Sequence, residues 1–213
     1  MNIFRLLGDL SHLASIFILI HKILVTKSCR GISFKTQLLY AIVFVSRYLA
    51  LFSPPSVYLI CMKLFFIASS LYILYLMKVQ FRTRHEVDID SIRLDVLLGT
   101  CFVLSLLFNY KFTPIEIAWS FSIFLEAVAI LPQMFLLQRL GEAETITTHY
   151  IFALGAYRAL YILNWIYRLM FEPKHHFDYI TFVAGLVQTG LYADFFYIYF
   201  TKVIQGQKFE LPA

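Results

Sequence analysis

The stretch PIEIAWSFSIFLEAVAILPQMFLL, residues 114–137, is apolar along almost its whole length, yet it contains two carboxylates and a Pro-Gln pair. A helix of about 20 apolar residues is long enough to cross a lipid bilayer. Glu126 lies inside this stretch, where an ionisable group is costly unless it is paired or hydrated. The stretch therefore predicts a membrane helix in which polar groups have a function.

The rest of the chain has the same character, because 60% of its 213 residues are hydrophobic and only 15% are charged. This composition is too apolar for an ordinary soluble domain and predicts an integral membrane protein in contact with the lipid bilayer. Stretches long enough to span a bilayer, separated by short polar breaks, occur seven times, at residues 4–25, 34–52, 57–77, 94–108, 114–137, 148–171 and 177–200. The first stretch lacks the features of a cleavable signal peptide, so we count it as a span.

The distribution of lysine and arginine predicts the orientation of the spans. Basic residues gather after the first, third and fifth spans and in the tail, whereas the opposite face has only Lys111 and Lys174. We therefore expect a lumenal N-terminus and a cytosolic tail, residues 201–213. The net charge of +5 then reflects cytosolic loops beside anionic lipid and arginines within the spans, and it indicates no nucleic-acid surface.

A weak internal repeat aligns residues 33–41 with residues 145–153, and each copy is followed by an arginine. The repeat predicts an all-α membrane protein, a single seven-helix domain that spans residues 1–213. Its seven transmembrane helices would form two parallel three-helix bundles, the first at residues 4–77 and the second at residues 114–200. An inverting fourth helix, residues 94–108, would join them. Parallel repeats of this kind hold their ligand between the bundles.

Pro132 and Gln133 predict a distortion of the fifth span. The proline leaves a helix carbonyl without its donor, and the adjacent glutamine amide can satisfy that carbonyl. A tolerated kink and a functional hinge are both consistent with the pair.

Ionisable residues inside the predicted spans are candidate functional groups by default. Arg5, Asp9 and His12 share one face of the first helix because of their spacing. The others are Arg47, Glu126, Arg158, Arg168 and Asp194, with Glu116 at the start of the fifth span. Local pairing with Arg5 or His12 is the interpretation we favour for Asp9.

Three of these arginines, Arg5, Arg47 and Arg168, fall toward lumenal ends of their helices, where like charges repel unless an anion joins them. Two alternatives follow. The carboxylates within the spans pair with the arginines, or a ligand with several carboxylates binds them through bidentate hydrogen bonds.

The sixth span presents Tyr157, Tyr161, Trp165 and Arg168 as one stripe. Such a stripe most often packs against other helices, but the terminal arginine favours a peptide groove, because Tyr and Trp supply both apolar area and hydrogen-bond donors. His12 is the residue whose charge changes between neutral and mildly acidic compartments. It is either simply hydrogen-bonded to a neighbour or part of a proton-linked latch with Asp9, Glu126 and Tyr157.

The sequence shows no arrangement of residues typical of a catalytic site or a metal site. Cys29, Cys61 and Cys101 lack metal-ligand spacing and favour buried thiols. No nucleophile and base recur at usable spacing, so we expect no enzyme, no cofactor and no metal.

The charged and aromatic motifs together resemble those of the KDEL receptors, the ER lumen protein-retaining receptors. The resemblance runs nearly end to end and rests on MNIFRLLGDLSH (1–12), CRGIS (29–33), RYL (47–49), EAVAILPQ (126–133), GEAETITTHY (141–150), YRALY (157–161), Asn164-Trp165 and DFFY (194–197). It implies a receptor that binds the C-terminal Lys/His-Asp-Glu-Leu (K/HDEL) signal of ER-resident proteins in the acidic Golgi. Such a receptor returns with its cargo in COPI-coated vesicles and releases it in the near-neutral ER.

The resemblance also implies roles for individual residues. Arg47 would bind the terminal carboxylate, Arg5 the glutamate and Arg168 the aspartate of the signal. The other ligand-binding residues would be Tyr48, Glu116, Trp119, Arg158, Tyr161, Asn164 and Trp165. His12 would sense pH together with Glu126 and Tyr157, and Asp194, Lys202 and Lys208 would serve transport.

Two departures from the family pattern matter. Ala50 stands where the family has an aspartate, so we expect the Lys and His forms of the signal to differ less through charge. The tail keeps Lys202 and Lys208 where relatives carry more lysines, which weakens the expectation of COPI binding. The main alternative is a transporter of a small anionic solute, since Ala129–Gln133 also resembles the signature of the PQ-loop transporters. A cleft with three arginines fits such a transporter poorly.

Overall fold

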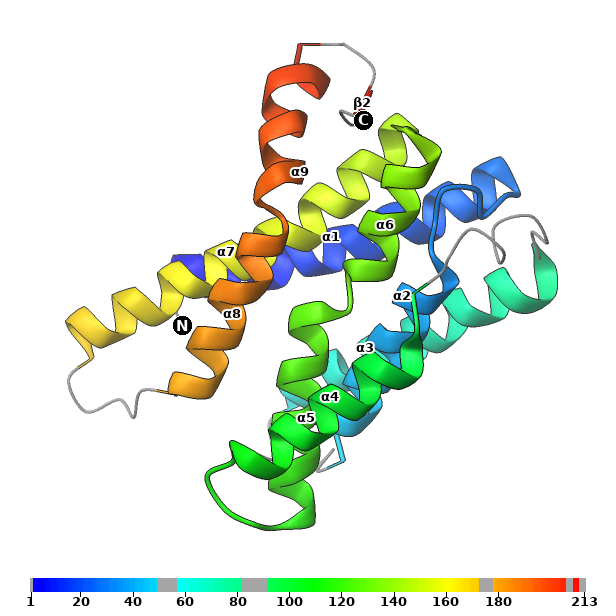
Figure 1. Cartoon of the computed structure of the whole chain (residues 1–213). Helices are drawn as coiled ribbons and strands as arrows, with labels where there is room; N and C mark the ends of the chain where they lie inside the picture. Colours follow the sequence, from blue (N-terminus) through cyan, green and yellow to red (C-terminus); the bar gives the residue numbers. More distant parts are fainter. Residues whose placement is uncertain (1, 50–56, 82–91, 173–177, 206–208, 211–213) are drawn as a thin grey trace. The chain divides into compact units, whose positions relative to one another are not determined.

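The computed structural model describes residues 2–49, 57–81, 92–172, 178–205 and 209–210 (Figure 1). Its α-helices are α1 (Ile3–Thr26), α2 (Phe34–Arg47), α3 (Val57–Tyr75), α4 (Leu94–Leu107), α5 (Pro114–Val128), α6 (Leu131–Leu140), α7 (Thr145–Phe171), α8 (Tyr179–Leu191) and α9 (Ala193–Ile198). Two π-helical turns follow α3 and α9, namely η1 (Leu76–Gln80) and η2 (Tyr199–Val203). A short antiparallel pair joins β1 (Glu142–Ala143) to β2 (Phe209–Glu210).

Four of the described helices begin at a polar residue whose side chain caps them. The side chains of Asn2, Ser33, Thr113 and Asp178 each accept a hydrogen bond from a backbone N–H in the first turn of α1, α2, α5 and α8, respectively. These N–H groups have no partner within the helix, so a side-chain acceptor stabilises the end. Short capping residues therefore fix where four of the apolar helices start.

Three predicted spans differ from the helices observed. The stretch 114–137 is interrupted by a turn at residues 129–130, between α5 and α6, as expected for a proline that follows closely. The stretch 177–200 breaks at Tyr192, where α8 gives way to α9, and Figure 1 shows the bend. The second helix ends at Arg47 rather than continuing, and residues 50–56 lie outside the described part of the chain.

Several helices suit a bilayer. Among the described residues, three helical segments are long and apolar enough to cross a membrane, Ile3–Thr26, Val57–Gln80 and Pro114–Leu140, and α4 and α8 are shorter apolar helices. Large apolar side chains such as Phe17, Leu64, Phe102 and Val183 are exposed on these helices, as expected of surfaces that face lipid. The chain is thus an almost entirely helical protein with several helices compatible with a membrane. The arrangement of seven spans stays a prediction.

The contacts divide the chain into two compact units. The first unit, residues 1–31 and 137–213, is built on α1 and α7, which pack along each other, and α8 packs on α7. At one end of this pair, Lys22 is almost fully buried. Its ammonium group donates to the Arg30 carbonyl and pairs with Glu144 (Nζ to Oε2, 3.3 Å), just before α7.

The second unit, residues 32–136, packs α2 against α3 and α5, and α4 against α5. A polar junction joins the start of α2 to the start of α6. Gln133 Oε1 accepts from the Ser33 N–H (2.8 Å), and the Gln133 N–H donates to Thr36 Oγ1 (3.0 Å). Pro132-Gln133 therefore does more than distort a helix, because Gln133 connects α6 to α2.

The predicted bundles, residues 4–77 and 114–200, follow different boundaries from these units. The contacts group α1 with α7 and α8, whereas the repeat grouped the first span with the second and third. The division into two parallel three-helix bundles stays a prediction from the repeat.

Candidate functional site

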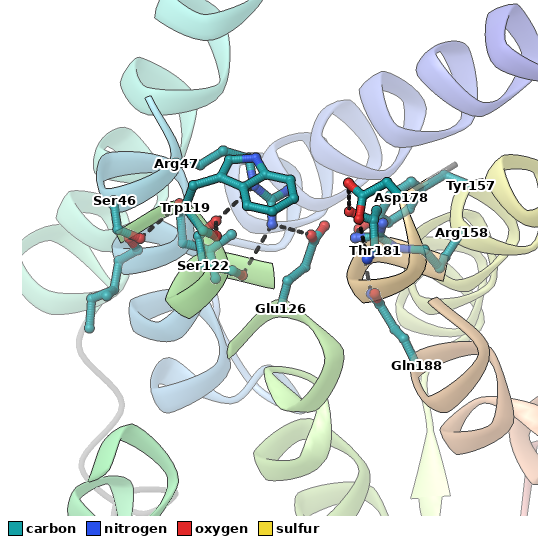
Figure 2. Close-up of polar contacts among 12 residues, drawn as sticks. Ser46, Arg47, Trp119, Ser122, Glu126, Tyr157, Arg158, Asp178, Thr181 and Gln188 are labelled. Carbon is teal, nitrogen blue, oxygen red and sulfur yellow. Dashed lines mark hydrogen bonds and ion pairs between the residues drawn. The ribbon is translucent and has the colours of Figure 1, made fainter. Parts of the chain in front are cut away.

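Arg47, at the last turn of α2, makes an ion pair inside the second unit (Figure 2). Its Nη2 lies 2.6 Å from Glu126 Oε2 and donates to the Ser122 carbonyl at 3.1 Å, and its Nε donates to the Ser122 hydroxyl at 3.1 Å. Glu126 is 1% exposed and Arg47 is 17% exposed. A buried pair of this kind needs good geometry and further hydrogen bonds to offset the loss of hydration. The first alternative for the arginines, an internal carboxylate partner, is therefore realised at Arg47.

The remaining candidates of the second unit lie at the end of α2 and along α5. Tyr48 follows Arg47, stacks on Phe44 with ring centroids 6.1 Å apart, and lies under the Lys63 ammonium. The Trp119 carbonyl accepts from the Ser122 hydroxyl at 2.6 Å. Glu116 lies in the first turn of α5, where a negative charge is favourable. Ala50 lies outside the described residues.

In the first unit, the polar face of α1 meets the aromatic stripe of α7. The Tyr161 hydroxyl donates to Asp9 Oδ1 at 2.5 Å. His12 is buried and stacks flat on Tyr157, with ring centroids 4.3 Å apart and an interplanar angle of 8°. The sequence did not predict Tyr161 as a partner of Asp9, because the contact depends on which helix packs against α1.

Arg5 lies on the same face of α1 and is half-buried. Within the part of the chain that the structure describes, its guanidinium makes no ion pair.

The three rings of the predicted stripe on α7 contact one another in turn. Tyr157 and Tyr161 meet edge to face at 6.3 Å, and Tyr161 and Trp165 meet at 6.0 Å. The guanidinium of Arg158 lies 5.2 Å from the Tyr157 ring centre, within the range of a cation–π contact. The Tyr157 hydroxyl accepts from Arg158 at 3.3 Å and from Gln188 of α8 at 3.4 Å (Figure 2).

The far end of α7 carries two further candidates. Arg168 pairs with Glu172 one turn on, with Nε to Oε2 at 2.8 Å, and both side chains are partly exposed. Exposed pairs of this type contribute little to stability. Asn164 is buried and accepts from the Asn2 side chain at 2.8 Å, which ties α7 to the start of α1.

The candidates for transport lie near the C-terminal end. Asp194 is exposed in the first turn of α9. Lys202 belongs to η2, its side chain lies outside the described part, and Lys208 lies outside it altogether. The His149 ring nitrogen Nδ1 lies 2.7 Å from the Tyr199 hydroxyl, which connects α7 to η2 just before this tail.

Two of the three cysteines are buried. Cys29 and Cys101 are buried, as expected, but the prediction of a buried thiol is wrong at Cys61, which is exposed on α3. The apolar residues around Cys61 in the sequence reflect a helix surface that suits lipid, and they do not place this thiol in the protein core. Among the described residues, no group of three or more His, Cys, Asp or Glu side chains could hold a metal ion.

Sequence reasoning missed several partners of the candidates. Ser122 lies one turn before Glu126 on α5 and Glu172 lies one turn after Arg168, so helical spacing contained a signal for both. Gln188 and Lys22 offered no such signal, because their burial depends on the packing of α8 and α1 against α7.

Comparison with known proteins now gives the family. The model of the family described as "ER lumen protein retaining receptor" matches residues 28–168. The chain belongs to this family. It is similar over its whole length, and over the whole length of the relatives, to the ER lumen protein-retaining receptor of Drosophila melanogaster (55% identity) and to ER lumen protein-retaining receptor 2 of Bos taurus (56%) and Homo sapiens (55%). The family resemblance predicted from the charged and aromatic motifs is confirmed.

Proposed function

We propose that this protein is a retrieval receptor that binds the C-terminal K/HDEL signal of ER-resident proteins. The observation that carries the proposal is the identity of at least 55% with relatives named ER lumen protein-retaining receptors along the entire chain. The charged residues support it, because an Asp-Glu-Leu terminus presents three carboxylates and the chain holds three candidate arginines. The function needs no cofactor and no catalytic group.

The proposal includes the location of the protein. A seven-helix protein of the Golgi and ER membranes, with a lumenal N-terminus and a cytosolic tail, fits the distribution of lysine and arginine. Binding in the Golgi and release in the ER then require return transport, for which we propose a COPI contact through Lys202 and Lys208. Asp194 is exposed and close to that tail in the sequence, which suits a role in transport.

Arg47 is the proposed ligand of the terminal carboxylate. It is held by Glu126 and Ser122, so its orientation is fixed before any peptide arrives. A peptide carboxylate would share Arg47 with Glu126, and the repulsion between the two anions would favour a change in the Arg47–Glu126 pair on binding. This exchange gives Glu126 its proposed role in coupling binding to conformational change.

The first unit would supply the ligands of the other two carboxylates. Arg5 would bind the glutamate of the signal and Arg168 the aspartate, the latter by displacing the weakly held Glu172. Tyr161 and Trp165 would line the groove between them. The remaining proposed contacts are Tyr48, Glu116, Trp119, Arg158 and Asn164.

The pH dependence would come from His12. Its ring is buried on Tyr157, one turn from Asp9 and two turns from Arg5 on the same helix. Protonation would add a positive charge near an anionic ligand, so the peptide would bind more tightly at acidic pH, and by linkage bound peptide would favour the protonated ring. A coupling of about 1.4 kcal/mol would change the affinity about tenfold.

Ala50 bears on which form of the signal is preferred. Without the family's carboxylate at this position, a lysine at the first position of the signal would gain less from charge, so we propose similar affinities for Lys-Asp-Glu-Leu and His-Asp-Glu-Leu peptides. Titration of both peptides, with Ala50→Asp beside the wild type, tests this. A strong lysine preference that Ala50→Asp does not change would contradict it.

Peptide binding to the purified protein tests the function itself. A peptide ending in Lys-Asp-Glu-Leu should bind at mildly acidic pH, and the same peptide with an amidated C-terminus should bind at least about tenfold more weakly, because Arg47 then loses a charged partner. Arg47→Lys should have a similar effect, since lysine offers no bidentate hydrogen bonds. Equal binding of both peptides would overturn the assignment, and uptake of a small anion without peptide binding would establish the transporter instead.

A further inference from the structure

Three glycines of the first unit lie directly against aromatic rings. Gly8 of α1 faces Tyr161, Gly185 of α8 faces Trp165, and Gly155 of α7 faces Tyr192. In each case a Cβ atom placed on the glycine would come closer than 3.0 Å to a ring atom, which real Cβ atoms essentially never do. The first two rings belong to the stripe that would line the peptide groove, and the third does not.

Gly8 gives Tyr161 its place beside α1. A Cβ atom at position 8 would lie 2.9 Å and 3.0 Å from two ring carbons of Tyr161 and 3.4 Å from the Tyr157 carbonyl oxygen. The neighbouring residue, Asp9, accepts the hydrogen bond of the Tyr161 hydroxyl. One side of α1 thus fixes both ends of this ring, its carbons by close approach and its hydroxyl by a hydrogen bond.

Gly185 does the same for Trp165 from α8. A Cβ atom there would lie 2.7 Å from indole carbon Cζ3 and 3.2 Å from Cη2. Phe182, one turn earlier on α8, meets the same indole edge to face at 6.2 Å. The indole lies over the glycine, and a methyl group at position 185 would force the indole to shift.

We propose that Gly8 and Gly185 are positioning residues for signal recognition, because they set the orientation of the Tyr161 and Trp165 rings. Gly8 and Gly185 touch these two rings, and the rings are the proposed contacts with the peptide. The inference rests on the proposed function. It adds that the specificity of the groove depends on two small residues outside α7, neither of which carries a functional group.

Alanine substitutions test the proposal in the full-length protein. Gly185→Ala and Gly8→Ala should each weaken binding of a Lys-Asp-Glu-Leu peptide about tenfold, or about 1.4 kcal/mol, per folded receptor. Gly155→Ala introduces a comparable clash with Tyr192 away from the stripe, and Gly190→Ala lies on α8 with no atom within 4 Å of its added methyl group. Both controls should bind the peptide normally, although Gly155→Ala should lower the thermal stability.

A double-mutant cycle separates positioning from general loss of stability. Trp165→Phe removes the six-membered ring that carries Cζ3, so in this background Gly185→Ala should cost little further affinity. The Phe background also keeps the test valid if Gly185→Ala alone does not fold. Normal affinity of Gly185→Ala, an equal loss in Gly155→Ala, or the same tenfold loss in both backgrounds would overturn the proposal. If the wild-type receptor itself binds no peptide, the proposed function fails, and that result is distinct from these.

Discussion

At the scale of single residues, charges in an apolar chain have chemical partners that the sequence indicated only in part. The sequence predicted that Arg5, Arg47 and Arg168 would need anions, and two of them have a glutamate within 3 Å. Helical spacing could have predicted Glu172 as the partner of Arg168, but not Glu126 as the partner of Arg47, since that contact joins α2 to α5. The stripe from Tyr157 to Trp165 was fully predictable, because one helix produces it.

The pair of Arg47 with Glu126 yields a prediction at this scale. Glu126→Gln leaves the shape almost unchanged but removes the anion that would compete with the terminal carboxylate of the peptide. We expect the variant to bind the peptide more tightly at neutral pH, because the terminal carboxylate no longer shares Arg47 with a second anion. We also expect a loss of stability of about 3 kcal/mol, because the largely buried Arg47 loses its charge partner.

Peptide titration near pH 7.4 and thermal unfolding of the same preparation check both effects. Asp95→Asn is the matched control, since that carboxylate is exposed at the start of α4 and pairs with Arg93 instead of Arg47. Weaker binding of Glu126→Gln at neutral pH would contradict the proposed exchange at Arg47.

At the scale of elements, hydropathy predicted where most helices lie, and local chemistry explains where they stop. The break between α5 and α6 had a signal in Pro132, whereas the break at Tyr192 was missed, although Gly190 lies just before it. Contacts between helices, such as Gln133 with Ser33, had no signal in hydropathy. They arise from the packing of one helix against another, which the pattern of residues along a single helix does not predict.

The junction of α2 and α6 predicts an effect on stability. Gln133→Leu would leave the buried Ser33 N–H without its acceptor, and an unsatisfied buried donor costs about 1–3 kcal/mol. We therefore expect a clearly lower midpoint of thermal unfolding. Gln138→Leu is the control, because Gln138 is exposed on the same helix. Equal midpoints for the two variants would show that the junction does not stabilise the second unit.

At the scale of the whole molecule, the composition and the motifs were sufficient to predict a helical membrane protein of the ER lumen protein-retaining receptor family, and the full-length comparisons confirm the family. The seven spans, the two bundles and the orientation of the termini follow from the distribution of charge and from a weak repeat, and they stay predictions. The units defined by contacts cut across the repeat, since α1 and α7 come from opposite ends of the chain. Sequence separation alone could not indicate this pairing.

The central claim is that this receptor captures its signal in acid and releases it near neutrality through His12. The most direct test is the affinity of the purified wild-type protein for a Lys-Asp-Glu-Leu peptide from about pH 5 to about pH 8, with His12→Ala beside it. We predict that the wild type loses about tenfold or more in affinity across this range and that His12→Ala shows a nearly flat profile. A wild-type affinity that is constant or rises toward neutral pH, or an unchanged slope in His12→Ala, would contradict the account.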